Sequence, residues 1–412
     1  AALEQDERLR FVADWLPSQA PSMQRREGDP HALASIVYTS GTTGRPKGVM
    51  LSHYNMLSVA HAALACIDCY QQDVFLSFLP LSHTLERTAG YYLPIMAGAC
   101  VAHARSVSQL AQDLVTVRPT AMIAVPRIFE RVHGRILEKL DKQSPLARSL
   151  FDAAVRVGWQ HFLWRQGRAR WTPALLLNPL LRKLVGDKVT AKLGGNMRYA
   201  VSGGAALPFK VAQTFIGLGL EILQGYGMTE TSPVISANRP GNNDPLSVGE
   251  PFRGIEVRIG EHDELQVKTP GMMLGYWNNH AATREVIDPD GWLHTGDQAK
   301  IEDKRIYITG RLKDILVLSN GEKIPPGDME SAICMDGLFD QALIVGEGKS
   351  YQSAIVVLNS VLWFGFAKDR GLDPFDRDSL DNAGLQKKVV SRIQAQLHDF
   401  PGYAKVRRVI LT

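Results

Sequence analysis

The sequence has 412 residues, 45% of them hydrophobic and 21% charged, and its formal net charge is only +4. A chain of this length can bury a large core over two or more domains, so it needs no disulfides or structural metal. No apolar run is long enough to span a bilayer, and the charged segment AALEQDERLR at the N-terminus is not a signal peptide. Because the first residue is not methionine, we expect the chain to begin inside a longer protein.

Short apolar runs alternate with helical stretches over the first 250 residues. The expected strands are 34–38, 73–79, 120–125, 197–202 and 221–225, with a helix over 107–115. This alternation predicts an α/β domain with largely parallel sheets. In such sheets, ligands bind at the loops that follow the carboxyl ends of the strands.

From about residue 248 the pattern changes to closely spaced short strands, and later to a mixture of strands and helices. The expected elements are strands at 254–259, 264–269 and 305–308 and helices at 326–332 and 385–397. We therefore predict a large domain over 1–309, with a β-rich subdomain at about 248–309. A small α+β domain over 310–412 follows, and the hinge between the two domains is expected near 311–313.

Four cysteines occur, at Cys66, Cys69, Cys100 and Cys334. Cys66 and Cys69 form a lone C-x-x-C, and no second pair completes a zinc site. They are either a redox pair or two small apolar residues on one face of a helix over 60–69, and we favour the second interpretation. This usage fits a reducing, cytoplasmic compartment.

Residues 38–53 read YTSGTTGRPKGVMLSH, a composition typical of a phosphate-binding loop. Glycines let backbone N–H groups turn toward an anion, threonine hydroxyls add donors, and Lys47 adds charge. Pro46 and Gly48 flank the lysine, so the spacing is not that of a Walker A loop, which disfavours a kinase or motor ATPase. The residues alone predict a phosphorylated ligand. The candidates are Thr39, Ser40, Gly41, Thr42, Thr43, Gly44 and Lys47.

A second block, QGYGMTETSPV at 224–234, completes a resemblance that extends over nearly the whole chain. The chain resembles the adenylate-forming superfamily of acyl-CoA synthetases, luciferases and adenylation domains. The resemblance implies that Tyr226 stacks on adenine, that Thr229 contacts the α-phosphate, and that Glu230 helps to hold Mg²⁺ with Thr39 near the metal. Gly225 and Gly227 belong to the same nucleotide-binding block.

Further blocks carry the resemblance through the chain. In GWLHTGD, Asp297 matches the residue that binds the ribose; in GRLKDI, Arg311 matches a nucleotide contact and Lys313 the domain hinge. His83, in FLPLSHT, resembles the residue between the acyl pocket and the CoA channel, although a histidine after a proline is often only structural. A strip between adenine and the acyl carboxylate is implied at Gly203, Gly204 and Ala205.

The block AVPRIFERVHGRI at 124–136, the insertion that follows it and LGYWNN at 274–279 are similar to long-chain fatty acyl-CoA synthetases. This branch implies ATP-dependent activation of a long-chain fatty acid through an acyl-adenylate, with Mg²⁺, followed by transfer to coenzyme A. Lys47 and Arg311 would neutralise the triphosphate before the attack. The acceptor could instead be a carrier protein, and the sequence separates these two alternatives poorly.

The segment 127–192 carries 14 Lys and Arg against 5 Asp and Glu, an excess of +9. Tryptophans and a phenylalanine are interleaved with arginines there. This combination suits an anionic membrane surface, but an amphipathic helix packed on the main domain explains it equally. No nucleic-acid-binding module is visible.

The sequence departs from the family at both ends. Only 37 residues precede Tyr38, and no residue matches the family's C-terminal catalytic lysine, because Lys405 lies too early. If the chain were the whole molecule, we would expect it to bind ATP but to form adenylate slowly. A nucleotide-binding module without turnover and a membrane-associated scaffold are therefore weighed beside the enzyme, and oligomeric state is not readable.

Overall fold

The computed structural model describes residues 27–39, 46–312, 316–319, 322–324, 326–402 and 404–412. Its largest element is a seven-stranded sheet with the strand order β4-β3-β5-β6-β7-β8-β9. The strands from β4 to β7 run parallel, and β8 and β9 are added antiparallel. The strands are β3 (Val74–Ser77), β4 (Cys100–His103), β5 (Ala121–Ala124), β6 (Tyr199–Ser202), β7 (Glu221–Gly227), β8 (Val234–Ala237) and β9 (Glu250–Pro251).

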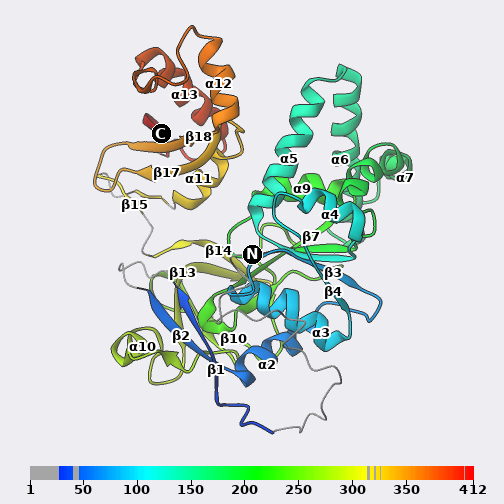
Figure 1. Ribbon diagram of the computed structural model, residues 1–412, viewed down its shortest axis with the longest axis vertical. Coiled ribbons are helices and arrows are strands. Elements are labelled where there is room, and N and C mark those ends of the chain that lie inside the picture. The colour runs from blue at the N-terminus through cyan, green and yellow to red at the C-terminus, as the bar shows by residue number, and fades with distance from the viewer. Residues whose placement is uncertain (1–26, 40–45, 313–315, 320–321, 325, 403) are drawn as a thin grey trace, which may run out of the picture.

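Helices cover both faces of this sheet, because successive side chains of each strand point to opposite sides. Leu76 and Met122 belong to the core beneath α4, α5 and α9, whereas Phe75 and Ile123 belong to the core beneath α2 and η1. Figure 1 shows the two layers. The helices are α2 (His53–Leu64), the π-helix η1 (Glu86–Tyr92), α3 (Leu93–Ala97), α4 (Leu110–Val117), α5 (Pro126–Asp141), α6 (Pro145–Arg165) and α9 (Phe209–Gly217).

The expected strand 34–38 exists, but it does not join the parallel sheet. It is β1 (Leu33–Thr39), which pairs antiparallel with β2 (Lys47–Ser52), and β2 pairs with β12 (Gly275–Tyr276). Strands joined by so short a connection pair as a hairpin, since parallel pairing needs a longer crossover. Lys47 is therefore the first residue of strand β2.

The expectation for Cys66 and Cys69 was also wrong in part. The helix ends at Leu64, so both cysteines follow it instead of sharing one of its faces. Ser52 and Asn55 begin this helix with a reciprocal capping box. Both cysteines still pack against the apolar core, and burial raises the pKa of Cys69 to about 11, which disfavours a reactive thiolate.

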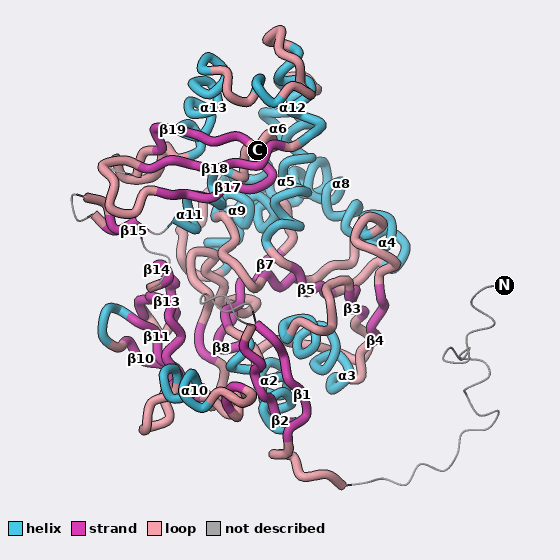
Figure 2. Tube along the Cα trace, turned by 60° about the vertical axis from the view of Figure 1, so that its left-hand side comes forward, coloured by secondary structure: helices cyan, strands magenta, loops and turns pink. Residues whose placement is uncertain are grey.

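Three further sheets occur among the described residues, the smallest of which pairs β15 (Leu316–Val317) with β16 (Lys323–Ile324). An antiparallel sheet contains β10 (Glu256–Ile259), β11 (Glu264–Lys268), β13 (Leu293–Glu302) and β14 (Arg305–Arg311). The C-terminal module has its own core, built on β17 (Phe339–Val345), β18 (Gln352–Leu358) and β19 (Val406–Leu411) with α11 (Pro326–Ile333), α12 (Ser360–Lys368) and α13 (Ala383–Gln396). In Figure 2 these three strands lie above the sheets of the large domain, with α12 and α13 above them.

The fold class predicted from the sequence, a large α/β domain followed by a small α+β domain, is confirmed. The exact domain boundary stays a prediction. The module contacts the large domain through α5, where the Arg127 guanidinium donates to the Asp340 carbonyl and Met335 packs against the core.

The remaining short elements are η2 (Pro173–Leu177), α7 (Asn178–Leu181), η3 (Arg182–Gly186), α8 (Asp187–Thr190), η4 (Ala191–Leu193), η5 (Thr229–Thr231), η6 (Glu261–Asp263), α10 (His280–Val286), β15 (Leu316–Val317), β16 (Lys323–Ile324) and η7 (Arg377–Ser379).

The insertion 127–192 forms a helical layer that lies against α9. Among the described residues, no helix is long and apolar enough to cross a bilayer. Helices α6 and α9 approach closely at two glycines: a methyl group on Gly158 would overlap the Gly217 carbonyl oxygen. The close crossing of these backbones therefore requires glycine.

Gly158→Ala is expected to lower the free energy of unfolding by about 1–3 kcal/mol, because the added methyl group forces the two helices apart. Thermal denaturation followed by circular dichroism measures the change. Gly134→Ala is the matched control: Gly134 lies inside α5 with open space around it, so alanine should stabilise the helix by up to about 1 kcal/mol. Equal melting temperatures for the two variants would contradict the close crossing.

Candidate functional site

A cavity of about 710 Å³ lies where the sheets of the large domain meet. Its wall consists of two groups of side chains: a polar group, which we call the polar end, and a group from one apolar cluster, which we call the apolar end. The polar end is lined by Thr39, Lys47, Thr229, Glu230, Asp297 and Arg311, and the apolar end by Ala63, Ile67, Phe75, Leu85, Ala89, Leu93, Ile123 and Val201. The candidates named from the sequence thus converge on one cavity from distant parts of the chain.

The hairpin β1–β2 brings Thr39 and Lys47 opposite each other. The two residues are paired in the strand register, and the Thr39 hydroxyl lies 3.4 Å from the Lys47 carbonyl oxygen. The Lys47 ammonium lies over the Tyr276 ring, 5.0 Å from its centroid. Lys47 is therefore held at the polar end by the sheet. The other phosphate-loop candidates, Ser40, Gly41, Thr42, Thr43 and Gly44, lie outside the described residues.

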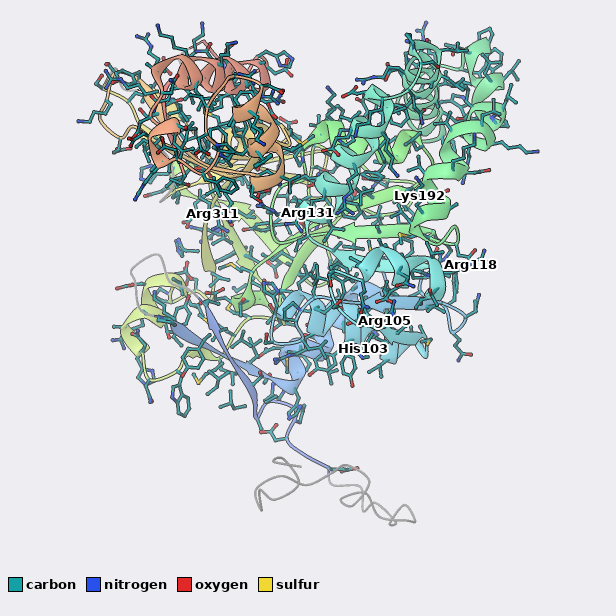
Figure 3. The ribbon with its side chains drawn as sticks, turned by 45° about the horizontal axis from the view of Figure 1, so that its top comes forward. His103, Arg105, Arg118, Arg131, Lys192 and Arg311 are labelled. Carbon is teal, nitrogen blue, oxygen red and sulfur yellow. The ribbon has the colours of Figure 1, made fainter. Side chains whose placement is uncertain are left out.

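Asp297 contacts two other residues that the sequence predicts to bind the nucleotide, Tyr226 and Arg311. The Tyr226 hydroxyl donates to one carboxylate oxygen at 2.6 Å, and the Arg311 Nε lies 2.9 Å from the other. Burial, followed by the charge of Asp297, raises the pKa of Tyr226 well above its usual value, so its hydroxyl stays protonated. Figure 3 shows Arg311 beneath the C-terminal module, at its boundary with the large domain. Lys313, two residues further, lies outside the described residues.

Glu230 is held by a residue that the sequence analysis had named only as part of a family block. The Tyr276 hydroxyl donates to Glu230 Oε1 at 2.8 Å. Burial and the neighbouring carboxylate raise the pKa of Tyr276, so it remains a donor. Tyr276 thus contacts both Lys47, through its ring, and Glu230, through its hydroxyl.

Glycines let the backbone approach the polar end. A Cβ atom at Gly227 would overlap the Pro233 carbonyl oxygen, so β7 closes against the loop after η5 only with glycine there. Gly203, Gly204 and Gly225 line the cavity as expected. Ala205 is exposed and is not part of the cavity wall. Of the three residues predicted after β6, only Gly203 and Gly204 therefore line the cavity.

His83 lies on the cavity wall, just before the helical segment that contains η1. Its Nδ1 accepts the Leu85 N–H at 3.2 Å. A neutral imidazole that accepts at Nδ1 carries its proton on Nε2. His83 thus contacts the start of a helix and also lines the cavity, and its place between an acyl pocket and a CoA channel stays a prediction.

Two further cavity residues were missed from the sequence. His294 Nδ1 lies 2.7 Å from Glu264 Oε2, and the other oxygen of Glu264 accepts the Gly296 N–H at 2.9 Å. These bonds fix the turn before Asp297. Histidine in GWLHTGD was visible in the sequence, but its partner lies 30 residues earlier on a neighbouring strand, where no local pattern indicates it.

Two family models match the chain. The family described as "AMP-binding enzyme" matches residues 2–277, and the "AMP-binding enzyme C-terminal domain" matches residues 313–408. The chain belongs to the AMP-binding enzyme family. The resemblance stated from the sequence is confirmed at this level, while the role of each site residue stays a prediction.

Relatives in this family carry related names. The chain is 32% identical over 408 residues to long chain acyl-CoA synthetase 6, peroxisomal, of Arabidopsis thaliana, covering 93% of this chain and 56% of the relative. It is also 32% identical to the putative fatty-acid–CoA ligase fadD11 of Mycobacterium tuberculosis, covering 93% and 67%. The chain thus spans little more than half of the Arabidopsis relative.

Solved structures share the fold. The A domain of a carboxylic acid reductase from Segniliparus rugosus, in complex with AMP and a co-purified carboxylic acid, aligns with a TM-score of 0.68 at 22% identity. The alignment covers 96% of this chain and 58% of that chain. At this identity the likeness establishes the AMP-binding enzyme fold alone.

Tyr276→Phe is expected to weaken the binding of ATP with Mg²⁺ by about tenfold, because Glu230 loses a charge-assisted hydrogen bond that orients it. Isothermal titration calorimetry measures the change. Tyr307→Phe is a matched control, since the Tyr307 hydroxyl donates to Asp244 at 3.0 Å outside the cavity. ATP affinity that falls equally in both variants, or in neither, would contradict the assignment.

Proposed function

We propose that the protein activates a long-chain fatty acid with ATP and transfers the acyl group to coenzyme A. The observation that carries this proposal is the two-ended cavity, which offers cations and hydrogen-bond donors at one end and an aliphatic wall at the other. A fatty acid has the matching division between carboxylate and chain. Burial of the chain against these side chains contributes about 0.8 kcal/mol for each CH₂ group.

The polar end suits the first step of this chemistry. The carboxylate of the acid attacks the α-phosphorus of ATP, the bond to pyrophosphate breaks, and an acyl-adenylate forms. Two anions must approach each other, so Lys47 and Arg311 would lower the barrier by neutralising the phosphates. Tyr226 and Asp297 would bind the adenosine, and Thr229 would contact the α-phosphate.

Mg²⁺ fits the oxygen donors at the polar end. The described residues contain no cluster of three or more His, Cys, Asp or Glu side chains that could hold a metal by themselves. Mg²⁺ that arrives with a nucleotide needs few protein ligands, because phosphate oxygens and water complete its shell. The Glu230 carboxylate and the Thr39 hydroxyl both face the cavity and would hold the ion. The ion would supply charge neutralisation of the triphosphate.

In the second step a thiol displaces AMP from the acyl-adenylate. The thiol sulfur bonds to the acyl carbon, the carbon–oxygen bond to AMP breaks, and a proton leaves the thiol. His83 faces the cavity near the acyl end and would border the entering thiol. Coenzyme A is the acceptor we propose; a carrier protein bears a thiol of the same chemical class, so its pantetheine arm is the alternative.

Incubation of the complete protein with ATP, Mg²⁺, coenzyme A and a panel of fatty acids is expected to release AMP and pyrophosphate only with long-chain acids, and to form acyl-CoA. Lys47→Ala and Glu230→Ala should each reduce AMP release at least about a hundredfold, because the first removes a cation that neutralises the phosphates and the second removes a proposed ligand of Mg²⁺. Mass spectrometry of the products measures acyl-CoA. AMP release without acyl-CoA would indicate a carrier-protein acceptor, and ATP binding without any AMP release would overturn the synthetase.

We also infer a cytoplasmic protein that contacts an anionic membrane through the insertion. Four leucines, Leu176, Leu177, Leu180 and Leu184, are exposed on the run from η2 to η3, with Leu176 at 71%. We call this set the leucine face. Arg182 and Lys183 are exposed on the same run, Lys188 is exposed on α8 directly after it, and the exposed Trp171 precedes it.

This arrangement favours a lipid surface over the simple packed helix. Packing on the domain uses the other side of the run, where Leu175 and Leu181 are buried, and leaves the leucine face uncovered. Apolar side chains bordered by cations are typical of helices that lie in a membrane interface. In Figure 1, α7 lies at the outer edge of the helical layer, away from the C-terminal module.

Replacing Leu176, Leu177 and Leu180 together with glutamine is expected to weaken binding to vesicles of phosphatidylcholine with phosphatidylglycerol about tenfold or more, because three apolar side chains no longer enter the interface. Vesicle cosedimentation measures binding. The matched control replaces three residues outside the leucine face, Ile95, Val107 and Val361, whose side chains are comparably exposed. Vesicle binding that is unaltered in the leucine variant would overturn the contact.

A further inference from the structure

The hydroxyl of Thr84 is buried without a partner. Thr84 is 1% exposed, and its Oγ1 has no hydrogen bond within the described residues. A buried polar atom left unpaired costs free energy, so nearly all such atoms in folded proteins are satisfied by a protein group, water or a ligand. Thr84 also lines the large cavity, so a ligand there could reach its hydroxyl.

The neighbours of Thr84 place it between the two ends of the cavity. His83 precedes it on the cavity wall, while Leu85 follows it and begins the apolar side. Leu85 in turn lies against Gly203, on the strip that ends β6: a Cβ atom at Gly203 would be 3.3 Å from Leu85 Cδ2. If a fatty acid extends its chain along the apolar wall from Leu85, its carboxyl group lies next to Thr84.

The backbone around Thr84 is well fixed. The His83 N–H donates to the Pro80 carbonyl, the Leu85 N–H donates to the His83 ring, and the Arg87 N–H donates to the His83 carbonyl. The Arg87 side chain also reaches the Leu81 carbonyl at 2.8 Å. Thr84 thus presents its hydroxyl from a rigid turn, with little conformational freedom left to lose on binding.

We propose that Thr84 is a substrate-binding residue whose hydroxyl donates a hydrogen bond to the carboxyl oxygen of the acid, and then to the carbonyl oxygen of the acyl-adenylate. Both acceptors are oxygens, and the hydroxyl supplies one donor. The inference rests on the proposed function, since it assumes that an acyl group enters this cavity. It assigns the recognition of the acyl head group to a side chain of the segment that contains η1.

Thr84→Val separates this role from a structural one, because valine keeps the shape and removes only the hydroxyl. The free protein should melt at the same or a higher temperature, since an unpaired buried polar atom is removed. The affinity for ATP should not change. The kcat/KM for the acid in AMP release should fall about tenfold or more, and Thr84→Ser should retain most of it.

Thr88→Val supplies the matched stability control. Thr88 is buried on η1, but its hydroxyl donates to the Ser232 carbonyl at 3.0 Å. Valine there leaves that carbonyl unpaired, so this variant should melt at a lower temperature than the wild type. Opposite changes in melting temperature for two buried threonines, four residues apart, follow only if Thr84 has no protein partner.

Wild-type kinetics with the acid in Thr84→Val would overturn the inference, as would a lower melting temperature together with weaker ATP binding. The two proposals fail separately. If the wild type releases no AMP with any acid, the proposed function fails, and binding of an acylsulfamoyl-adenosine to the wild type and Thr84→Val is measured by calorimetry. Weaker binding to the variant then supports the contact; equal binding, or none to either protein, overturns it.

Discussion

The Asp297 carboxylate joins the large sheet to the four-stranded sheet that precedes the C-terminal module. It accepts from Tyr226 of the large sheet and pairs with Arg311, which ends the four-stranded sheet and precedes the C-terminal module. Both bonds involve the Asp297 carboxylate, which is buried, whereas the Arg311 side chain is 65% exposed. The bond from Tyr226 is therefore the strong buried contact, and solvent screens the ion pair with Arg311. The polar end of the cavity has its shape because these groups meet.

A second junction repeats the same chemistry. Tyr276, from the three-stranded sheet, donates to Glu230, which follows the large sheet. In both junctions burial and a carboxylate raise the pKa of the tyrosine, so the phenol stays protonated and remains a donor at neutral pH. In each junction a tyrosine hydroxyl donates to a carboxylate, and these two bonds hold the charged groups of the cavity in place where the sheets meet.

Much of this could be predicted from the sequence, because the nucleotide motifs and the strands of the parallel sheet are local patterns. The strand over 120–125 and the helix over 385–397 appear close to their expected positions as β5 and α13. The pairing of β1 could not be read, since an apolar run does not reveal which strand it joins. Tyr276 and Glu264 were missed as site residues for a related reason: their partners lie on other strands, and only the folded chain brings them together.

The segment from Leu85 to Leu93 has a consequence for the choice of substrate. Leu85, Ala89 and Leu93 are spaced four residues apart and all line the apolar wall. Ala89 is the small member of this row, so a larger side chain at position 89 would extend further into the cavity. Under the proposed function, this change would shorten the acid that fits without altering any group at the polar end, which makes position 89 suited to engineering of chain-length preference.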